Sequence, residues 1–279
     1  MLGWQAALAC GLVGAYLGLL YFPPRDRTVQ KIAIIHHLSS SGGTVVSKCI
    51  AALPDVVLLS EMHPLIGMGK PFFLPIDPLA QFLVNYPQLA PDPETLNREF
   101  RARLEVVARI CQAEGKLLVL RDHTHSDYLT NFEPRQRLVE ALDQNYEIQR
   151  LVTLRNPIDA WLSMKVSQHD HHIPHFSDYC DRVLKFLDDH AQLPLWRYED
   201  FVSKPHNVVA EICTYLGIRF DPSFSSRFGI KTLTGDSGRK PAKIVELPRR
   251  DYPKKFVDEV AASRSFAVIA ARFGYTALR

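Results

Sequence analysis

One segment near the start of the chain limits its fold more than any other: a short apolar run, a turn of small residues, and then a helix. Residues 31–37 (KIAIIHH) are rich in β-branched side chains and are followed by small polar residues, which is typical of a buried strand. Residues 39–44 (SSSGGT) form the predicted turn, and a helix is predicted over residues 44–53, before Pro54. In such a turn glycines let backbone N–H groups approach an anion closely, and the helix N-terminus adds its positive end. The segment therefore predicts an anion-binding loop.

The same alternation continues along the chain. Apolar runs predict strands at residues 31–37, 56–59, 117–120, 148–154 and 194–198. Helical patterns lie at residues 44–53, 94–114 and 134–142, from Pro157 onwards, and at 205–216. Strands that alternate with helices imply an α/β domain with a doubly wound, mainly parallel sheet flanked by helices. Residues 62–92 are rich in Pro and Gly and are predicted to form a loop over the core.

Composition excludes several classes of protein. The 279 residues are 47% hydrophobic and 23% charged, as in an ordinary folded domain rather than a disordered or collagen-like chain. A net charge of +3 is too small for a dedicated nucleic-acid binder, so no nucleic-acid partner is expected. Residues 236–255, however, contain seven Lys/Arg against three Asp/Glu, which indicates a small anionic ligand near them.

The first 22 residues contain no charged side chain, and two prolines follow them. A helix of that length would reach roughly 33 Å, enough to cross a bilayer, and aromatic residues lie near both of its ends. We therefore expect residues 1–24 to form a hydrophobic membrane-anchor helix and residues 25–279 to form a separate domain. The alternatives are a segment that only rests on the membrane and a wrongly assigned chain start.

Flanking charges and cysteines give an expected orientation. Arg25, Arg27 and Lys31 follow the apolar segment, so the positive-inside rule places the domain on the cytoplasmic side. The five cysteines are odd in number and widely spaced, without a C-x-x-C pair, which favours free thiols in a reducing compartment. An oxidising lumen is the alternative.

Three further motifs follow the turn. The predicted strand at 148–154 ends in Arg155, and Ser163 comes eight residues later, about two helical turns past Pro157. An arginine at the carboxyl end of a strand in an open α/β sheet points into the crevice where ligands bind. Residues 196–201 (WRYEDF) and 234–241 (TGDSGRKP) complete the set, and the last of these carries part of the basic window.

Together the four motifs resemble the sulfotransferase superfamily, whose donor is 3′-phosphoadenosine-5′-phosphosulfate (PAPS), over about residues 31–245. The resemblance implies a P-loop-like sulfotransferase fold and a catalytic domain over residues 25–279. It implies that the turn binds the 5′-phosphosulfate, that Arg155 and Ser163 bind the 3′-phosphate, and that Tyr198 lies near the adenine. A late loop would close on the 3′-phosphate. The residues implied in donor binding are Ser40, Ser41, Gly42, Gly43, Thr44, Val45, Arg155, Ser163, Tyr198, Gly238, Arg239 and Lys240.

The sequence departs from the family pattern at one position of the turn. The family often has Lys or Arg just before its S-G-x-T, where the base stabilises the bridging oxygen, and this chain has Ser40. Three alternatives follow: serine and backbone donors suffice, Lys48 or another base reaches in, or activity is impaired.

Two residues are candidates for the base that takes the acceptor's proton. Histidine suits this role because its ordinary pKa is about 6.5. His123 follows the strand at 117–120, and the resemblance places it on the catalytic histidine of soluble family members. Other members use a glutamate after the second strand, a position that Glu61 occupies here. We favour His123 over Glu61.

The expected activity is transfer of a sulfuryl group from PAPS to a hydroxyl or amine of a small-molecule, carbohydrate or lipid acceptor, with release of adenosine 3′,5′-bisphosphate. The alternatives are a membrane-attached nucleotide-binding module without catalysis and a P-loop nucleotide kinase, which the missing Walker lysine disfavours. Four histidines lie within residues 169–175, but no cysteine or second ligand cluster supports them, so no metal is expected.

Overall fold

The computed structural model describes residues 29–65, 87–89, 91–130, 133–142, 144–167, 173–233 and 244–276. Five strands form one sheet: β1 (Gln30–His37), β2 (Val56–Met62), β3 (Leu117–Asp122), β4 (Tyr146–Leu154) and β5 (Leu195–Arg197). Their order is β2-β3-β1-β4-β5 and every pair is parallel, as the alternation of strands and helices predicts. The predicted strand at 194–198 is one residue too long at each end, because Tyr198 already begins a helix.

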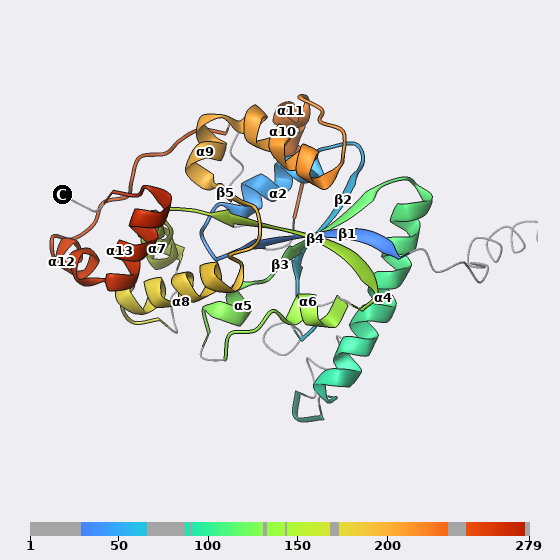
Figure 1. The fold of residues 1–279 in the computed structure, drawn as a ribbon, viewed down its shortest axis with the longest axis horizontal. Helices are drawn as coiled ribbons and strands as arrows, with labels where there is room; N and C mark the ends of the chain where they lie inside the picture. The colour runs from blue at the N-terminus through green and yellow to red at the C-terminus, as the bar shows by residue number, and fades with distance from the viewer. Residues whose placement is uncertain are drawn as a thin grey trace, which may run out of the picture.

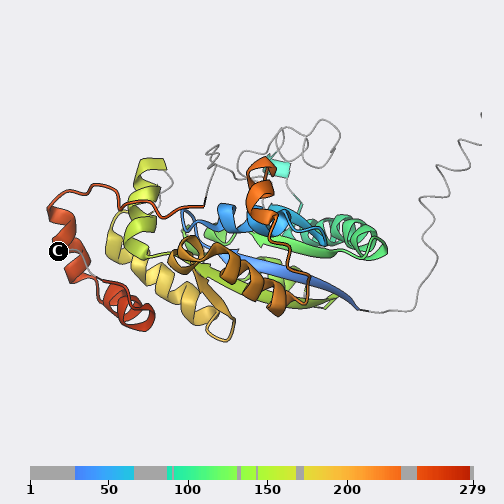
Figure 2. The ribbon, with the colours of Figure 1, turned by 90° about the horizontal axis from the view of Figure 1, so that it is seen from above.

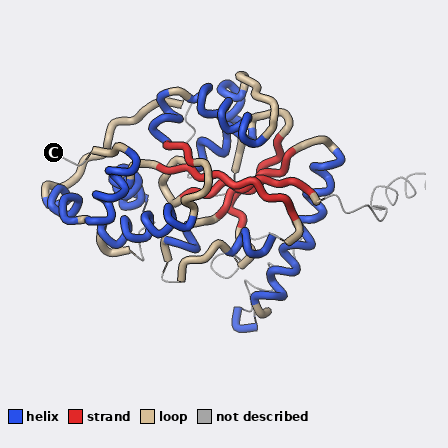
Figure 3. The backbone as a smooth tube through the Cα atoms, viewed as in Figure 1, coloured by secondary structure: helices blue, strands red, loops and turns tan. Residues whose placement is uncertain are grey.

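Helices cover both faces of this sheet (Figures 1 and 3). One face is covered by α2 (Gly43–Ala51), α9 (Tyr198–Ser203), α10 (Pro205–Leu216) and α11 (Phe224–Arg227). The other is covered by α4 (Pro93–Ala113) and α6 (Arg137–Leu142). Alternate residues of β1 divide between the faces: Ala33 and Ile35 pack toward α2, whereas Ile32 and Ile34 pack toward α4. This double burial explains why β1 reads as a continuous apolar run.

A third apolar cluster, made mainly of helices, lies beyond the carboxyl end of β4. It contains α7 (Pro157–Ser167), α8 (Phe176–Asp189), α12 (Lys255–Ala262) and α13 (Arg264–Phe273), which lie together at one end of the molecule (Figure 2). Aromatic rings carry much of the packing here, with Phe176 in contact with Trp161, Phe256 and Phe266. The sequence analysis predicts α7 but neither α8 nor the C-terminal pair.

The remaining elements are short: α5 (His125–Tyr128), η1 (Pro87–Leu89) and η2 (Phe228–Ile230). Glycines with positive φ follow two of the predicted helices: Gly217 comes directly after α10, and Gly115 comes two residues after the end of α4, past Glu114. Cys49, Cys111, Cys180 and Cys213 are buried free thiols, as predicted.

The expected anchor at residues 1–24 lies outside the described residues. Within the described ranges, the helices lack the length or the apolar composition needed to span a bilayer. Other predicted features also lie outside the described residues: most of the 62–92 loop, the late loop with Gly238, Arg239 and Lys240, and His169, His171 and His172.

Candidate active site

All five strands are parallel, so the loops that follow them meet at one edge of the sheet. The loop after β1 leads through residues 38–42 into α2, whose first residue is Gly43. The N–H groups of Gly43 and Thr44 open the helix and have no carbonyl one turn back to bond, and no side chain caps this end of α2. Together with the positive end of the helix dipole, they can receive an anion.

Each glycine of this turn lies against an aromatic ring. A Cβ atom on Gly42, whose φ is +82°, would lie 2.2 Å from the Tyr198 ring, and one on Gly43 would lie 2.4 Å from the His37 ring. Any side chain at either position would therefore displace a ring. The turn needs glycine at Gly42 for both conformation and space, and at Gly43 for space.

Arg155 joins three of the predicted donor residues. Its Nη1 donates a hydrogen bond to the backbone oxygen of Ser40 (3.1 Å), and its guanidinium lies 5.0 Å from the centre of the Tyr198 ring. Tyr198, at the start of α9, in turn covers Gly42. The ends of β1, β4 and β5 thus bring Ser40, Gly42, Arg155 and Tyr198 into one cluster.

The other described donor candidates lie near this cluster in sequence or in the fold, but within the described part of the chain they make no hydrogen bond with Arg155. Ser41 donates its hydroxyl to the oxygen of Leu38 (2.7 Å), which closes the turn on itself. Thr44 and Val45 are half-buried in the first turn of α2. Ser163 is buried in α7, and among the described residues no hydrogen bond or ion pair joins it to Arg155. Lys48 is buried in α2 rather than solvated.

A half-buried carboxylate holds the segment that carries Arg155. Glu199 accepts a hydrogen bond from the backbone N–H of Asn156 (2.8 Å) and another from the hydroxyl of Tyr275 (3.3 Å). Burial raises the pKa of Glu199. Because Asn156 directly follows Arg155, Glu199 and the C-terminal Tyr275 fix the backbone that presents Arg155.

The two candidate bases are hydrogen-bonded to each other. Oε2 of Glu61 lies 3.0 Å from Nε2 of His123, and Oε1 of Glu61 lies 2.9 Å from Nη2 of Arg121. Burial alone would raise the pKa of the Glu61 carboxyl, but the hydrogen bond from His123 and the charge of Arg121 lower that pKa to about 2. Glu61 has a φ of +59°, a conformation that costs energy in a non-glycine residue and is often found at functional sites.

The surroundings of His123 leave it within reach of solvent. Its side chain is 19% exposed, its Nδ1 lies 2.6 Å from the Ser126 hydroxyl, and its ring centre is 3.6 Å from that of His125. Both neighbours lie in the first turn of α5, which follows β3 closely. The adjacent Asp122 faces away from His123 and bonds His36 (2.8 Å) and the Thr124 hydroxyl (2.9 Å) instead.

Arg121 and His37 are site residues that the sequence analysis does not assign. Arg121 is buried, and it donates Nε–H to Nε2 of His37 (2.6 Å) and Nη1–H to the Ser60 hydroxyl (2.9 Å). Burial, with the adjacent Arg121 charge, holds the pKa of His37 well below its usual value, so this ring is neutral. An arginine at the end of an apolar strand, as in LLVLRDH, was the available signal. Arg121 therefore links the ring beneath Gly43 to the carboxylate beside His123.

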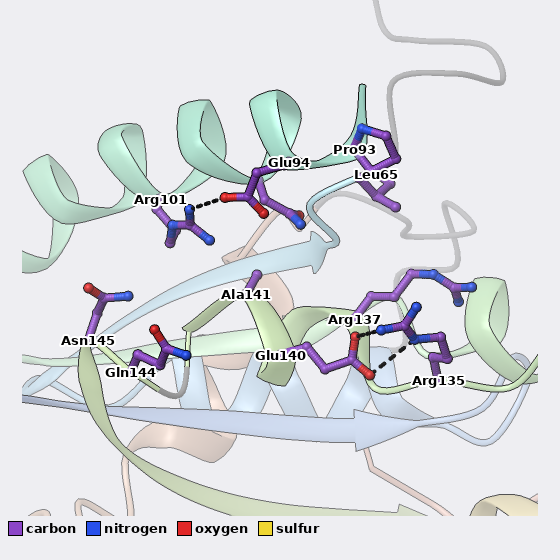
Figure 4. A pocket seen from close by; sticks show the side chains of 11 residues that line it. Leu65, Pro93, Glu94, Arg101, Arg135, Arg137, Glu140, Ala141, Gln144 and Asn145 are labelled. Atoms are coloured by element: carbon purple, nitrogen blue, oxygen red, sulfur yellow. Dashed lines mark hydrogen bonds and ion pairs between the residues drawn. The ribbon is translucent and has the colours of Figure 1, made fainter. Parts of the chain in front are cut away.

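A cavity of about 590 Å³ lies apart from these residues, between α4 and α6 (Figure 4). Four of its charged side chains pair with one another, Arg101 with Glu94 (3.0 Å) and Arg135 with Glu140 (2.6 Å), and Arg137 pairs with Asp127. No predicted donor or base residue lines it. The candidate site is therefore the strand-end cluster, not this cavity.

Comparison with known proteins decides the fold. The sulfotransferase domain of the Synechococcus PCC 7002 olefin synthase superposes with a TM-score of 0.60 at 16% identity, over 92% of this chain and 99% of that domain. The chain has the sulfotransferase fold. The sulfotransferase domain from the curacin biosynthetic pathway gives a TM-score of 0.55 at 17% identity, over 90% of this chain and 99% of that domain. No protein-family model matches the sequence, and no curated protein matches it.

The resemblance recognised from four short motifs thus agrees with the fold of nearly the whole chain. At identities below one residue in five, this similarity establishes the sulfotransferase fold and leaves the activity to be argued from the site.

Proposed function

We propose that the chain is a sulfotransferase that uses PAPS as donor. The observation that carries this proposal is the meeting of two sets of residues at one edge of the sheet. One set is an anion-receiving helix start with Arg155 and Tyr198 beside it, and the other is the hydrogen-bonded pair of Glu61 and His123. An enzyme that transfers a group from an anionic donor needs both a site that binds this donor and a base near the acceptor.

In the proposed reaction the acceptor oxygen or nitrogen attacks sulfur. The new bond to sulfur forms as the bond from sulfur to the bridging phosphate oxygen breaks. Adenosine 3′,5′-bisphosphate leaves with that electron pair, and the acceptor's proton passes to the base. The N–H groups at the start of α2 stabilise the charge that develops on the departing phosphate.

The low pKa of Glu61 supports His123 as that base. A carboxylate with a pKa of about 2 is a weak proton acceptor near neutral pH. It can instead hold Nε2–H of His123, which leaves Nδ1 to receive the proton once the acceptor displaces the Ser126 hydroxyl. A base oriented by a third group is the usual arrangement in such sites.

The acceptor and the location are also proposals. We propose a small-molecule, carbohydrate or lipid acceptor, and a domain attached to the membrane through residues 1–22 on its cytoplasmic side, from the charges of Arg25, Arg27 and Lys31.

Donor binding tests the proposal through Arg155. The wild type should bind adenosine 3′,5′-bisphosphate at least about 10-fold more tightly than adenosine 5′-monophosphate, because Arg155 forms charge-assisted hydrogen bonds with the 3′-phosphate. Arg155→Ala should remove this preference without unfolding the protein, and calorimetry measures both affinities. Arg272→Ala is the matched control, since Arg272 is exposed and pairs with Asp188 on α8.

Two results would favour the alternatives. Unchanged bisphosphate affinity in Arg155→Ala would remove the donor assignment, and equal binding of ATP by the wild type would favour a kinase. Tight PAPS binding without sulfation over a broad acceptor panel would favour the nucleotide-binding module.

A further inference from the structure

Three side chains beside the proposed base form a possible ligand set for a cation. Glu61, His123 and His125 each offer one ligand atom, and these atoms all lie within 4.8 Å of one another. The three side chains are partly exposed, so a hydrated ion can reach them. We propose that Glu61, His123 and His125 bind a divalent transition-metal cation such as Zn²⁺, and that this cation inhibits the transfer reaction.

The types of ligand select the class of metal. Two imidazoles and one carboxylate suit Zn²⁺, which they bind at about 2.0–2.2 Å, whereas Mg²⁺ prefers oxygen ligands and retains its water. Oε2 of Glu61 and Nε2 of His123 are already 3.0 Å apart, close to the separation that one small cation requires. The ligand atom of His125 lies within 4.8 Å of the other two, so its ring must move closer to complete a three-ligand site with one position open to water.

Groups around the ligands have the arrangement expected of a second coordination shell. The Ser126 hydroxyl lies 2.6 Å from Nδ1 of His123, so its oxygen can accept a hydrogen bond from Nδ1–H when Nε2 binds the metal. Arg121 holds Oε1 of Glu61 at 2.9 Å and leaves Oε2 for the cation. The positive charge of Arg121 also repels a cation, so binding should be weaker than in a structural zinc site.

Inhibition follows from the position of the His123 proton, and this half of the inference rests on the proposed function. With metal on Nε2, the neutral ring carries its proton on Nδ1, the atom that the proposed reaction needs as acceptor. The cation also takes Oε2 of Glu61 away from its role in orienting the ring. Metal binding and proton transfer therefore exclude each other.

Calorimetry on the full chain tests the binding half without substrates. We expect one Zn²⁺ per chain and no detectable heat with Mg²⁺. His125→Gln should weaken zinc binding at least about 10-fold, and Ser126→Ala should weaken it by a similar factor through the second shell. A thermal melt of each variant checks that it is folded.

A matched control separates this site from the other histidines of the chain. The triple variant His169→Gln, His171→Gln, His172→Gln should bind zinc as the wild type does. Loss of binding in the triple variant, or wild-type affinity in folded His125→Gln, would overturn the assignment.

An activity measurement tests the inhibition half. Zinc should inhibit sulfation, EDTA should reverse the inhibition, and His125→Gln should need at least about 10-fold more zinc for the same effect. Tight binding without inhibition would overturn this half alone. Absence of sulfation in the metal-free protein would count against the proposed function and would leave the calorimetric result standing.

Discussion

Single residues at the carboxyl edge of the sheet divide the proposed chemistry between them. His123 has hydrogen-bond partners at both ring nitrogens and is reachable from solvent, whereas Glu61 is held by Arg121 and by His123 itself. The two candidates, which the sequence presents as alternatives, are thus parts of one arrangement. Their separate contributions can be measured.

We expect His123→Ala to lower kcat about 10²–10⁴-fold, the usual contribution of a general base, with bisphosphate affinity nearly unchanged. Glu61→Gln should lower kcat less, because it removes an orienting carboxylate and leaves the imidazole. Steady-state kinetics of both variants, with calorimetry for donor binding, provides the comparison. An inactive Glu61→Gln beside an active His123→Ala would assign the base to Glu61. Loss of bisphosphate binding in His123→Ala would place His123 in the donor site instead.

At the scale of elements, donor binding at the turn of residues 39–44 depends on four segments. The β1–α2 turn supplies the N–H groups, the start of α9 places a ring over Gly42, and the end of β1 places another under Gly43. The segment after β4 adds Arg155, which bonds the turn through the oxygen of Ser40. A small change in any one of them should be transmitted to the others through these contacts.

Gly43→Ala tests this close packing. The new methyl group would lie 2.4 Å from the His37 ring, which Arg121 holds in place from its other side. Either the ring or the start of α2 must move, so bisphosphate affinity should fall at least about 10-fold, or the protein should lose about 1–3 kcal/mol of stability, as overpacked sites do.

Gly115→Ala is the matched control, because nothing lies within 4 Å of its Cβ position. Its φ of +63° should cost about 1 kcal/mol of stability, but bisphosphate binding should be unaffected. Wild-type affinity and stability in Gly43→Ala would contradict the packing argument.

On the scale of the whole molecule, three buried histidines make the fold sensitive to acid. Burial lowers the pKa of His36 and His37, and lowers that of His190 to about 3. The folded state keeps His190 neutral down to about pH 3, and burial makes His36 and His37 harder to protonate than in the unfolded chain, which protonates all three below about pH 6.5. The unfolded state then binds more protons, so the free energy of unfolding falls as the pH falls from about 6.5 toward 3.

His190 should contribute a slope of about 1.4 kcal/mol per pH unit well below pH 6.5 and above pH 3, and His36 and His37 should add to it in the same direction. His190→Phe should remove one histidine's share while keeping a ring between Phe186 and Tyr128. Urea unfolding between pH 8 and pH 5 measures the slope. His206→Gln is the control, since that side chain is exposed on α10 and should leave the slope as it is. Parallel curves for the wild type and His190→Phe would remove His190 from the explanation.

Deletion of residues 1–24 should leave a folded, donor-binding protein. The sheet begins at Gln30, so the deletion removes no strand. Circular dichroism and bisphosphate calorimetry provide the test. If residues 1–22 anchor the domain on the cytoplasmic side, protease added outside intact cells should leave the domain uncut. Digestion from outside would reverse that orientation.

Much of the architecture could be predicted from local sequence, because the spacing of apolar residues and the positions of Gly and Pro are local properties. Local backbone preferences account for the apolar run of β1, for the glycines of the turn, and for Pro157 and Gly217 at helix ends. The Arg155–Ser163 spacing and the WRYEDF segment likewise point to the sulfotransferase fold without any three-dimensional information. The helices α8, α12 and α13 were not predicted, because their apolar faces are buried only by packing against one another and against α7.

Contacts between distant segments could not be predicted in this way. Nothing in the sequence pairs Glu61 with His123 or seats His37 between Gly43 and Arg121, because strand order and register bring these residues together. The pKa values of Glu61 and His37 also follow from burial and neighbouring charge, which are properties of the packed chain. Residue types and their spacing thus indicated which chemistry to look for, while parallel pairing of β1, β2 and β3 set which atoms meet.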